Sequence, residues 1–263
     1  MRYPILSPTA PRAEFHDKVA LVVMAKAPRP GKVKTRLQPP LTAAEAAALN
    51  VCFLRDTTEN IASVAAEGRA AGLISYTPVG DEAAFDGLLP EGFALVAQRG
   101  DGFGERLHLA ATDILRCGFG AVCLIDSDSP TVPGSALREA VEGLRRPGDR
   151  VVLGGSADGG YYLIGLKAAH RAPFADITWS TPSVYDETVR QVKTAGLELV
   201  ELPTWYDVDE AVTLTALEDE LLEGRRPGFV SVDGYHARHT RRFLEERREG
   251  ALRAAEDSQP ELA

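Results

Sequence analysis

The chain has 263 residues, of which 44% are hydrophobic and 25% are charged, and its formal net charge at pH 7 is −9. This composition is typical of a folded globular protein, and the length is sufficient for one large domain or two small ones. The negative charge argues against a protein that coats nucleic acid, and no apolar run approaches the roughly 18 residues that a membrane span requires.

Short apolar runs alternate with longer segments of helical character. The predicted strands are 19–24, 73–78, 94–98, 121–125, 150–154, 161–166 and 198–202. The predicted helices lie near 42–67, 104–117, 134–144, 181–195 and 209–222. Strands that alternate with helices favour a parallel sheet covered on both faces. We therefore expect an α/β fold: a single domain with a mainly parallel central sheet and helices on both faces.

The sequence contains no internal repeat and no long linker. We expect a flexible N-terminal extension over residues 1–17, one folded domain over 18–224, and a charged C-terminal helix and tail over 225–263. The first segment has no apolar signal-peptide core. The cysteines lack metal-type spacing and are expected to be buried thiols in a reducing compartment, so we expect a cytoplasmic protein; they are Cys52, Cys117 and Cys123.

The loop after the first predicted strand concentrates positive charge. Its cationic side chains are Lys26, Arg29, Lys32, Lys34 and Arg36. Pro30 and Gly31 bend the backbone so that it can approach a ligand, and α/β folds bind ligands at such strand ends. The spacing is not that of a Walker P-loop. A solvated basic turn is the alternative, but we expect an anion site in which Lys34 and Arg36 bind phosphate oxygens.

Two carboxylates, Asp126 and Asp128, follow the fourth predicted strand. Carboxylate oxygens suit Mg²⁺ or Mn²⁺, which bridge to substrate phosphates. A turn rich in Asp and Ser, without a metal, is the alternative interpretation. Beside the basic loop, this pair favours a nucleotide whose phosphates carry the divalent metal.

Two further acidic turns are candidates for the site. Asp158 precedes Gly159 and Gly160 in a tight turn, which is either a simple hairpin or a place where a ligand approaches the backbone. After the last predicted strand, one interpretation of Asp209 is that it caps a helix, and Asp207 is then the freer group and a candidate metal contact. His236 and His239 are expected on a solvated helix face rather than in a metal site.

In this order, the motifs resemble the bacterial GT-A-like family catalogued as domain of unknown function 2064, also labelled rSAM/selenodomain-associated transferase 1. The resemblance extends from about Val19 to Leu217. It is carried by residues 25–37, 102–107, 128–130, 158–161 with 165–166, 179–181 and 207–209. It implies the nucleotide-diphospho-sugar transferase fold, which glycosyltransferases of type A share with several nucleotidyltransferases. Residues 18–224 are then expected to form a single GT-A/Rossmann-like, nucleotide-binding transferase domain.

The resemblance also implies roles for individual residues. Nucleotide and phosphate binding is expected of Ala25, Lys26, Pro30, Gly31, Lys34, Arg36, Gly104 and Arg106. The acceptor pocket is expected at Gly159, Gly160 and Trp179. The metal is expected at Asp126, Asp128 and Asp207 on the ground of their carboxylates and not of the resemblance. The chain departs from the family pattern at Asp126, where the family has Gly, at Thr131, where it has Asp, and at 211–213, where Pro-Glu-Asp is common. The metal site is therefore expected to be arranged differently.

Three functions follow from these residues. The first is glycosyl transfer from a nucleotide sugar to a small-molecule acceptor, with Asp158 as the general base. The second is nucleotidyl transfer from a nucleoside triphosphate to a phosphorylated small molecule, with Lys34 and Arg36 stabilising the departing pyrophosphate. The third is a nucleotide-binding module without activity. We expect the glycosyltransferase, with no nucleic-acid partner; the oligomeric state is left open.

Overall fold

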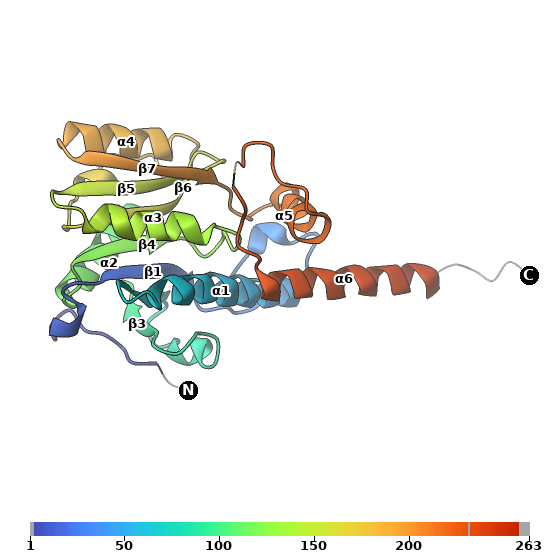
Figure 1. Cartoon of the computed structure of the whole chain (residues 1–263). Helices are drawn as coiled ribbons and strands as arrows, with labels where there is room; N and C mark the ends of the chain where they lie inside the picture. The colour runs from blue at the N-terminus through green and yellow to red at the C-terminus, as the bar shows by residue number, and fades with distance from the viewer. Residues whose placement is uncertain (1–2, 231, 258–263) are drawn as a thin grey trace, which may run out of the picture.

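The computed structural model describes residues 3–230 and 232–257. The described chain is built around a seven-stranded sheet (Figure 1). Its strands are β1 (Val19–Lys26), β2 (Ala70–Thr77), β3 (Ala94–Ala97), β4 (Ala121–Ile125), β5 (Arg150–Ser156), β6 (Tyr161–Leu166) and β7 (Glu198–Trp205). Its α-helices are α1 (Ala43–Ala65), α2 (Phe103–Arg116), α3 (Gly134–Arg145), α4 (Val184–Thr194), α5 (Ala211–Glu223) and α6 (Arg238–Asp257).

The strand order is β3-β2-β1-β4-β6-β5-β7. β6 is antiparallel to both of its neighbours, and all other pairs are parallel. The carboxyl ends of the six parallel strands therefore meet at one edge of the sheet. The turn between β5 and β6 lies at the same edge, because β6 begins where β5 ends. The predicted fold class, a mainly parallel α/β sheet, is confirmed.

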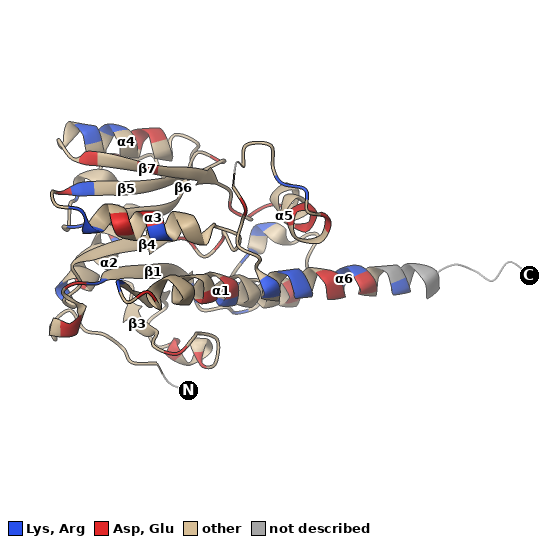
Figure 2. Cartoon of the chain, viewed as in Figure 1, with Lys and Arg blue, Asp and Glu red and all other residues tan. Residues whose placement is uncertain are grey.

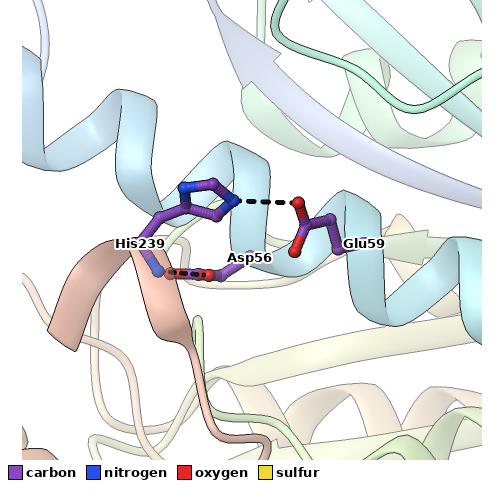
Figure 3. A group of neighbouring side chains, drawn as sticks. All are labelled: Asp56, Glu59 and His239. Carbon is purple, nitrogen blue, oxygen red and sulfur yellow. Dashed lines mark hydrogen bonds and ion pairs between the residues drawn. The ribbon is translucent and has the colours of Figure 1, made fainter. Parts of the chain in front are cut away.

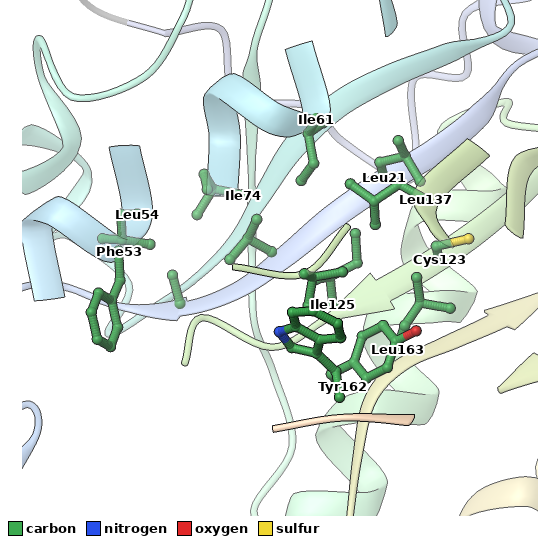
Figure 4. Packing of buried hydrophobic residues seen from close by; sticks show 14 of the residues in the cluster. Leu21, Phe53, Leu54, Ile61, Ile74, Cys123, Ile125, Leu137, Tyr162 and Leu163 are labelled. Carbon is green, nitrogen blue, oxygen red and sulfur yellow. The ribbon is translucent and has the colours of Figure 1, made fainter. Parts of the chain in front are cut away.

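Both faces of the sheet are buried, which explains why the strands are continuous apolar runs. In β1, Leu21 and Val23 face one hydrophobic cluster, whereas Ala20 and Val22 face the other. α1 and α3 pack on the first face, where Figure 4 shows Phe53 and Ile61 of α1 beside the strands, and α5 and α6 add further residues to that cluster. α2 and α4 cover the second face.

Element boundaries differ from the sequence prediction by a few residues. Strand β7 continues through Pro203 to Trp205, although the prediction ended it at Leu202. Proline is tolerated here because β7 is an edge strand that pairs only with β5. The predicted helix at 42–67 is α1, which begins after a reciprocal capping box between Thr42 and Glu45.

The chain ends pack on the domain in different ways. At the N-terminal side, Leu6 N donates to Leu95 O at 2.8 Å and Leu95 N donates to Pro4 O at 2.9 Å, so this segment lies along β3. At the other end, α6 extends past the body of the domain, and Figure 2 shows both signs of charge along it. The expected domain limits at residues 18 and 224 stay predictions. None of the helices in the described part of the chain is long and apolar enough to cross a membrane.

Candidate functional site

Two cavities adjoin each other at the carboxyl edge of the sheet. The larger, of about 500 Å³, is lined by carboxylates and aromatic rings and is called the acidic cavity below. The smaller, of about 240 Å³, has four cationic side chains among its ten lining residues and is called the basic cavity. Both are lined by Arg36, Ser127, Asp128 and Asp209. One ligand can therefore extend from the basic into the acidic cavity.

The basic cavity gathers the positive charge of the loop after β1. Its cationic lining residues are Lys26, Lys32, Lys34 and Arg36. Asn50 of α1 also lines it; this residue is 4% exposed, and its side-chain carbonyl oxygen has no hydrogen-bond partner. A cavity with this lining suits a multiply charged anion such as a chain of phosphates. Of the five cationic residues, only Arg29 turns away, to pair with Asp81 at 2.5 Å.

Lys34 is the central cation of the site. Its side chain is 3% exposed, and its ammonium lies 2.5 Å from Asp128 Oδ1 and 3.0 Å from Asp209 Oδ1. It also donates to the carbonyl oxygen of Val208 at 2.8 Å, and it lies 5.1 Å from the centre of the Phe53 ring. Burial acts to lower the pKa of Lys34, but the attraction of the two carboxylates outweighs it, so the pKa is raised. Lys34 is therefore a charged ammonium.

Five carboxylates line the acidic cavity: Asp126, Asp128, Asp158, Asp207 and Asp209. Burial, followed by repulsion from Asp128 and Asp207, raises the pKa of Asp126 well above its ordinary value. Burial, Asp158 and Asp209 raise the pKa of Asp207 to about 6. Lys34 pairs with Asp128 and Asp209, and Arg36 lies 3.9 Å from Asp209, whereas Asp126, Asp158 and Asp207 have no cationic partner in the described part of the chain.

The Asp126-x-Asp128 motif also forms a hydrogen-bonded turn, as the alternative interpretation of an Asp- and Ser-rich turn predicted. Asp126 Oδ1 accepts hydrogen bonds from the backbone N–H groups of Asp128 and Ser129, each at 3.2 Å, and Oδ2 accepts one from Ser129 Oγ at 2.7 Å. Asp207 Oδ1 in turn accepts one from Ser156 Oγ at 3.1 Å. The expected metal ligands Asp126, Asp128 and Asp207 thus share one cavity, although their oxygens do not all lie within 4.8 Å of one another.

Aromatic rings form the other wall of the acidic cavity. The rings of Phe103 and Trp179 are 5.0 Å apart and those of Tyr161 and Trp179 are 6.4 Å apart, both edge to face. Phe103 is 53% exposed. The Tyr161 hydroxyl is buried without a hydrogen-bond partner. Trp179 was expected in an acceptor pocket, whereas Phe103 and Tyr161 were not singled out, because a residue at the start of a helix or strand carries no sequence signal for a cavity.

Two glycines of the predicted motifs allow close packing beside this wall. The turn of Gly159 is the predicted hairpin, and its φ is +92°; an added Cβ there would lie 2.1 Å from Pro182 O. At Gly104 an added Cβ would lie 2.6 Å from Trp179 Nε1 and 2.9 Å from Phe174 O. Gly104 thus lets Trp179 rest directly on the start of α2, which sets the position of the indole.

Some of the remaining expected site residues line one of the two cavities, and others line neither. Gly160, Asp158 and Asp207 line the acidic cavity. The following expected residues line neither cavity: Ala25, Pro30, Gly31, Gly104, Arg106 and Gly159. The helix-cap interpretation of Asp209 is wrong: Glu210 is the N-cap residue of α5, in a reciprocal capping box with Thr213, and the Asp209 carboxylate instead binds Lys34.

A separate polar cluster joins α1 to α6 (Figure 3). Asp56 accepts hydrogen bonds from the backbone N–H groups of His239 and Thr240, and Glu59 accepts from the side chains of Arg238 and His239. Within the described residues, Asp56, Glu59 and His239 are the only three possible metal ligands whose atoms all lie within 4.8 Å of one another. Since their oxygens already accept hydrogen bonds from the start of α6, we interpret the cluster as an anchor for that helix. His239, expected on a solvated face, is half-buried here.

Comparisons with known proteins agree with this architecture. Residues 60–181 match the family model described as "Uncharacterized protein conserved in bacteria (DUF2064)". A "putative nucleotide-diphospho-sugar transferase" from Desulfovibrio desulfuricans G20 is 28% identical, with a TM-score of 0.70 over 89% of this chain and 98% of that chain. No curated protein matches the sequence.

Two more distant structures share the fold alone. One is the CMP:2-keto-3-deoxy-manno-octonic acid synthetase complexed with CTP, with 13% identity, a TM-score of 0.53, and coverage of 79% of this chain and 100% of that one. The other is a nucleotidyl transferase from Methanothermobacter thermautotrophicus, with 16% identity, a TM-score of 0.50, and coverage of 80% and 100%. The resemblance that the motifs indicated is thus confirmed: residues 60–181 match the model of the bacterial DUF2064 family, and the chain shares the fold of the putative nucleotide-diphospho-sugar transferase.

Proposed function

We propose that the protein is a metal-dependent transferase that acts on a nucleotide. In this proposal the basic cavity binds the phosphates, and the acidic cavity binds the reacting group and its acceptor. The observation that carries the proposal is that the two cavities share Asp128, Asp209 and Arg36 as lining residues. Phosphates held by Lys26, Lys32 and Arg36 would then end next to the carboxylates.

A divalent cation, Mg²⁺ or Mn²⁺, fits the residues of the acidic cavity. Asp126, Asp128 and Asp207 offer the hard oxygen ligands that these ions prefer. Burial, and after it repulsion from neighbouring carboxylates, raises the pKa of Asp126 and of Asp207, and a bound cation would offset both effects. These three side chains would hold the ion. When bound, it would neutralise charge on the departing phosphates.

Glycosyl transfer from a nucleoside-diphosphate sugar is the reaction we propose. The acidic cavity is large enough for a sugar ring, and the rings of Phe103 and Trp179 offer an apolar surface against which the C–H face of a sugar can pack. Asp158, an exposed carboxylate at the rim, would accept the proton of an acceptor hydroxyl. Lys34 and Arg36 would bind the oxygens of the departing diphosphate.

The basic cavity favours a second candidate, nucleotidyl transfer. Its four cationic side chains exceed what a diphosphate needs, and they suit the triphosphate of a nucleoside triphosphate. A phosphorylated acceptor is already ionised, so this reaction would require no general base, and Asp158 would be dispensable.

The phosphorus-containing product distinguishes the two reactions. The purified protein would be incubated with Mg²⁺, a small-molecule extract as the source of acceptors, and either nucleoside-diphosphate sugars or nucleoside triphosphates, and the products followed by ³¹P NMR. Glycosyl transfer is supported if the wild type releases a nucleoside diphosphate and the Asp158→Asn variant does not. Release of pyrophosphate supports the second candidate. A protein that converts neither class of donor, with or without Mg²⁺, contradicts the transferase proposal. Asp149→Asn is the matched control, because Asp149 is remote and pairs with His170.

A further inference from the structure

The Lys34 ammonium has an almost complete set of oxygen partners in the structure. Asp128 Oδ1, Asp209 Oδ1 and Val208 O lie 2.5, 3.0 and 2.8 Å from Nζ. One of these partners, Asp128, is also an expected ligand of the divalent metal. The ammonium and the metal therefore require the same carboxylate.

The backbone of Lys34 holds the side chain in this place. Its φ of +49° is in the left-handed region, which is uncommon for a residue other than glycine, at the start of the short helix Thr35–Leu37. The aliphatic part of the side chain is buried, with the ammonium over the Phe53 ring. The contact with the carboxylates is thus a specific, ordered arrangement rather than a surface ion pair.

A second set of partners lies within reach of the same ammonium. Lys34 lines the basic cavity but not the acidic one, whereas Asp128 and Asp209 line both. The ammonium is therefore at the junction of the two cavities. A rotation of the side chain toward the basic cavity would exchange carboxylate oxygens for the phosphate oxygens of a ligand bound there.

We infer that Lys34 is an internal counter-ion that occupies part of the metal site and leaves it when metal and phosphate bind. Before metal and phosphate bind, the ammonium would neutralise Asp128 and Asp209, the carboxylates that it contacts in the structure. On binding, the divalent cation takes over Asp128, and the ammonium pairs with the incoming phosphates. Metal binding and phosphate binding are thereby coupled. The metal gains Asp128 when the ammonium moves to the phosphates, and the phosphates gain the ammonium when the metal binds Asp128. This inference rests on the metal site proposed above.

The first test measures Mn²⁺ affinity without nucleotide, by water-proton relaxation. Lys34→Met removes the competing ammonium and is expected to bind Mn²⁺ at least tenfold more tightly than the wild type. Lys32→Met removes the same charge from the same cavity, but no carboxylate contact of Lys32 exists in the described structure. It is expected to change the affinity less than threefold. Equal or weaker Mn²⁺ binding by Lys34→Met than by the wild type would overturn the inference.

The second test uses the wild-type protein, in case Lys34→Met does not fold. Reductive methylation of lysines, followed by mass spectrometry, reports how accessible each amine is. Lys34 is expected to react much more slowly than Lys32 without metal, and at least fivefold faster with saturating Mg²⁺. A Lys34 rate that Mg²⁺ leaves unchanged would contradict the exchange. Neither test contains a nucleotide. A protein that binds no nucleotide would therefore refute the proposed function, whereas the role of Lys34 at the metal site would still be decided by these two tests.

Discussion

The Lys34 ammonium donates a 3.0 Å hydrogen bond to the carboxylate of Asp209, which is 175 residues away in the chain. This bond ties the loop after β1 to the loop after β7. These loops border the basic and the acidic cavity, so the pair stands at their junction. Charged residues from distant parts of the sequence are thus concentrated in one site.

Asp128→Asn is expected to abolish metal-dependent turnover, with a loss of at least a hundredfold, because Asp128 serves both the proposed metal and Lys34. It should also destabilise the fold by about 1–3 kcal/mol, since a buried ammonium loses one of its charged partners. Turnover and thermal unfolding would be compared with those of the remote variant Asp149→Asn. Metal-dependent activity that survives in Asp128→Asn would show that the metal site is misassigned.

Gly104→Ala is expected to destabilise the protein by about 1–3 kcal/mol, because the new methyl group would meet the Trp179 indole and the Phe174 carbonyl. Gly102→Ala is a close control. It lies two residues away, at an extended backbone position where an added Cβ meets nothing within 4 Å. Urea unfolding of both variants checks the prediction. Equal stability of the two would mean that Trp179 does not rest on Gly104.

Trp179→Ala is expected to weaken binding of a nucleoside-diphosphate sugar about tenfold, the cost of a lost aromatic contact of about 1–1.5 kcal/mol. Binding of the nucleoside diphosphate without the sugar should change less than twofold, since Trp179 lines only the acidic cavity. Calorimetric titration with both ligands checks this difference. An equal loss for both ligands would place Trp179 against the nucleotide rather than against the sugar.

The anchor between α1 and α6 is expected to weaken in acid. Burial acts to raise the pKa of Glu59, but hydrogen bonds from Arg238 and His239 outweigh it, so its pKa lies below the ordinary 4.5. The stabilisation is therefore present above pH 4.5 and is lost as the pH falls through the lower folded value. At pH 7, Glu59→Gln should increase amide hydrogen exchange in α6, and its stability difference from the wild type should shrink toward pH 3.

A control for this effect is available on the same helix. Glu246→Gln removes a carboxylate that pairs with Arg242 four residues earlier and is 63% exposed, so it should leave the exchange of α6 nearly unchanged. If Glu59→Gln and Glu246→Gln behave alike at every pH, the Asp56–Glu59–His239 cluster does not anchor the helix.

Much of the fold was predictable because hydrophobic periodicity is a local property. The β4 run Ala121–Ile125 and the β6 run Tyr161–Leu166 were predicted with the bounds observed. The loop chemistry was also readable, since charge and glycine are visible in the sequence, and Lys34 and Arg36 do line the basic cavity.

The pairing inside the site was not predictable from sequence. Asp209 has the pattern of a helix cap, and only the approach of the β1 and β7 loops gives it Lys34 as a partner. Phe103 and Tyr161 line the acidic cavity because α2 and β6 both begin at its rim, which depends on tertiary packing. The nature of the transferred group depends on the shape of that cavity and on its ligand, neither of which a local motif encodes.

The central claim is that the joined cavities bind a nucleotide together with a divalent metal. The most direct measurement is the thermal unfolding of the wild-type protein with a panel of nucleoside triphosphates, nucleoside diphosphates and nucleoside-diphosphate sugars, each with and without Mn²⁺. The account predicts that at least one nucleoside-diphosphate sugar raises the melting temperature in the presence of Mn²⁺ and that this increase disappears in Asp207→Asn. An unchanged melting temperature with every nucleotide, with and without Mn²⁺, would contradict it.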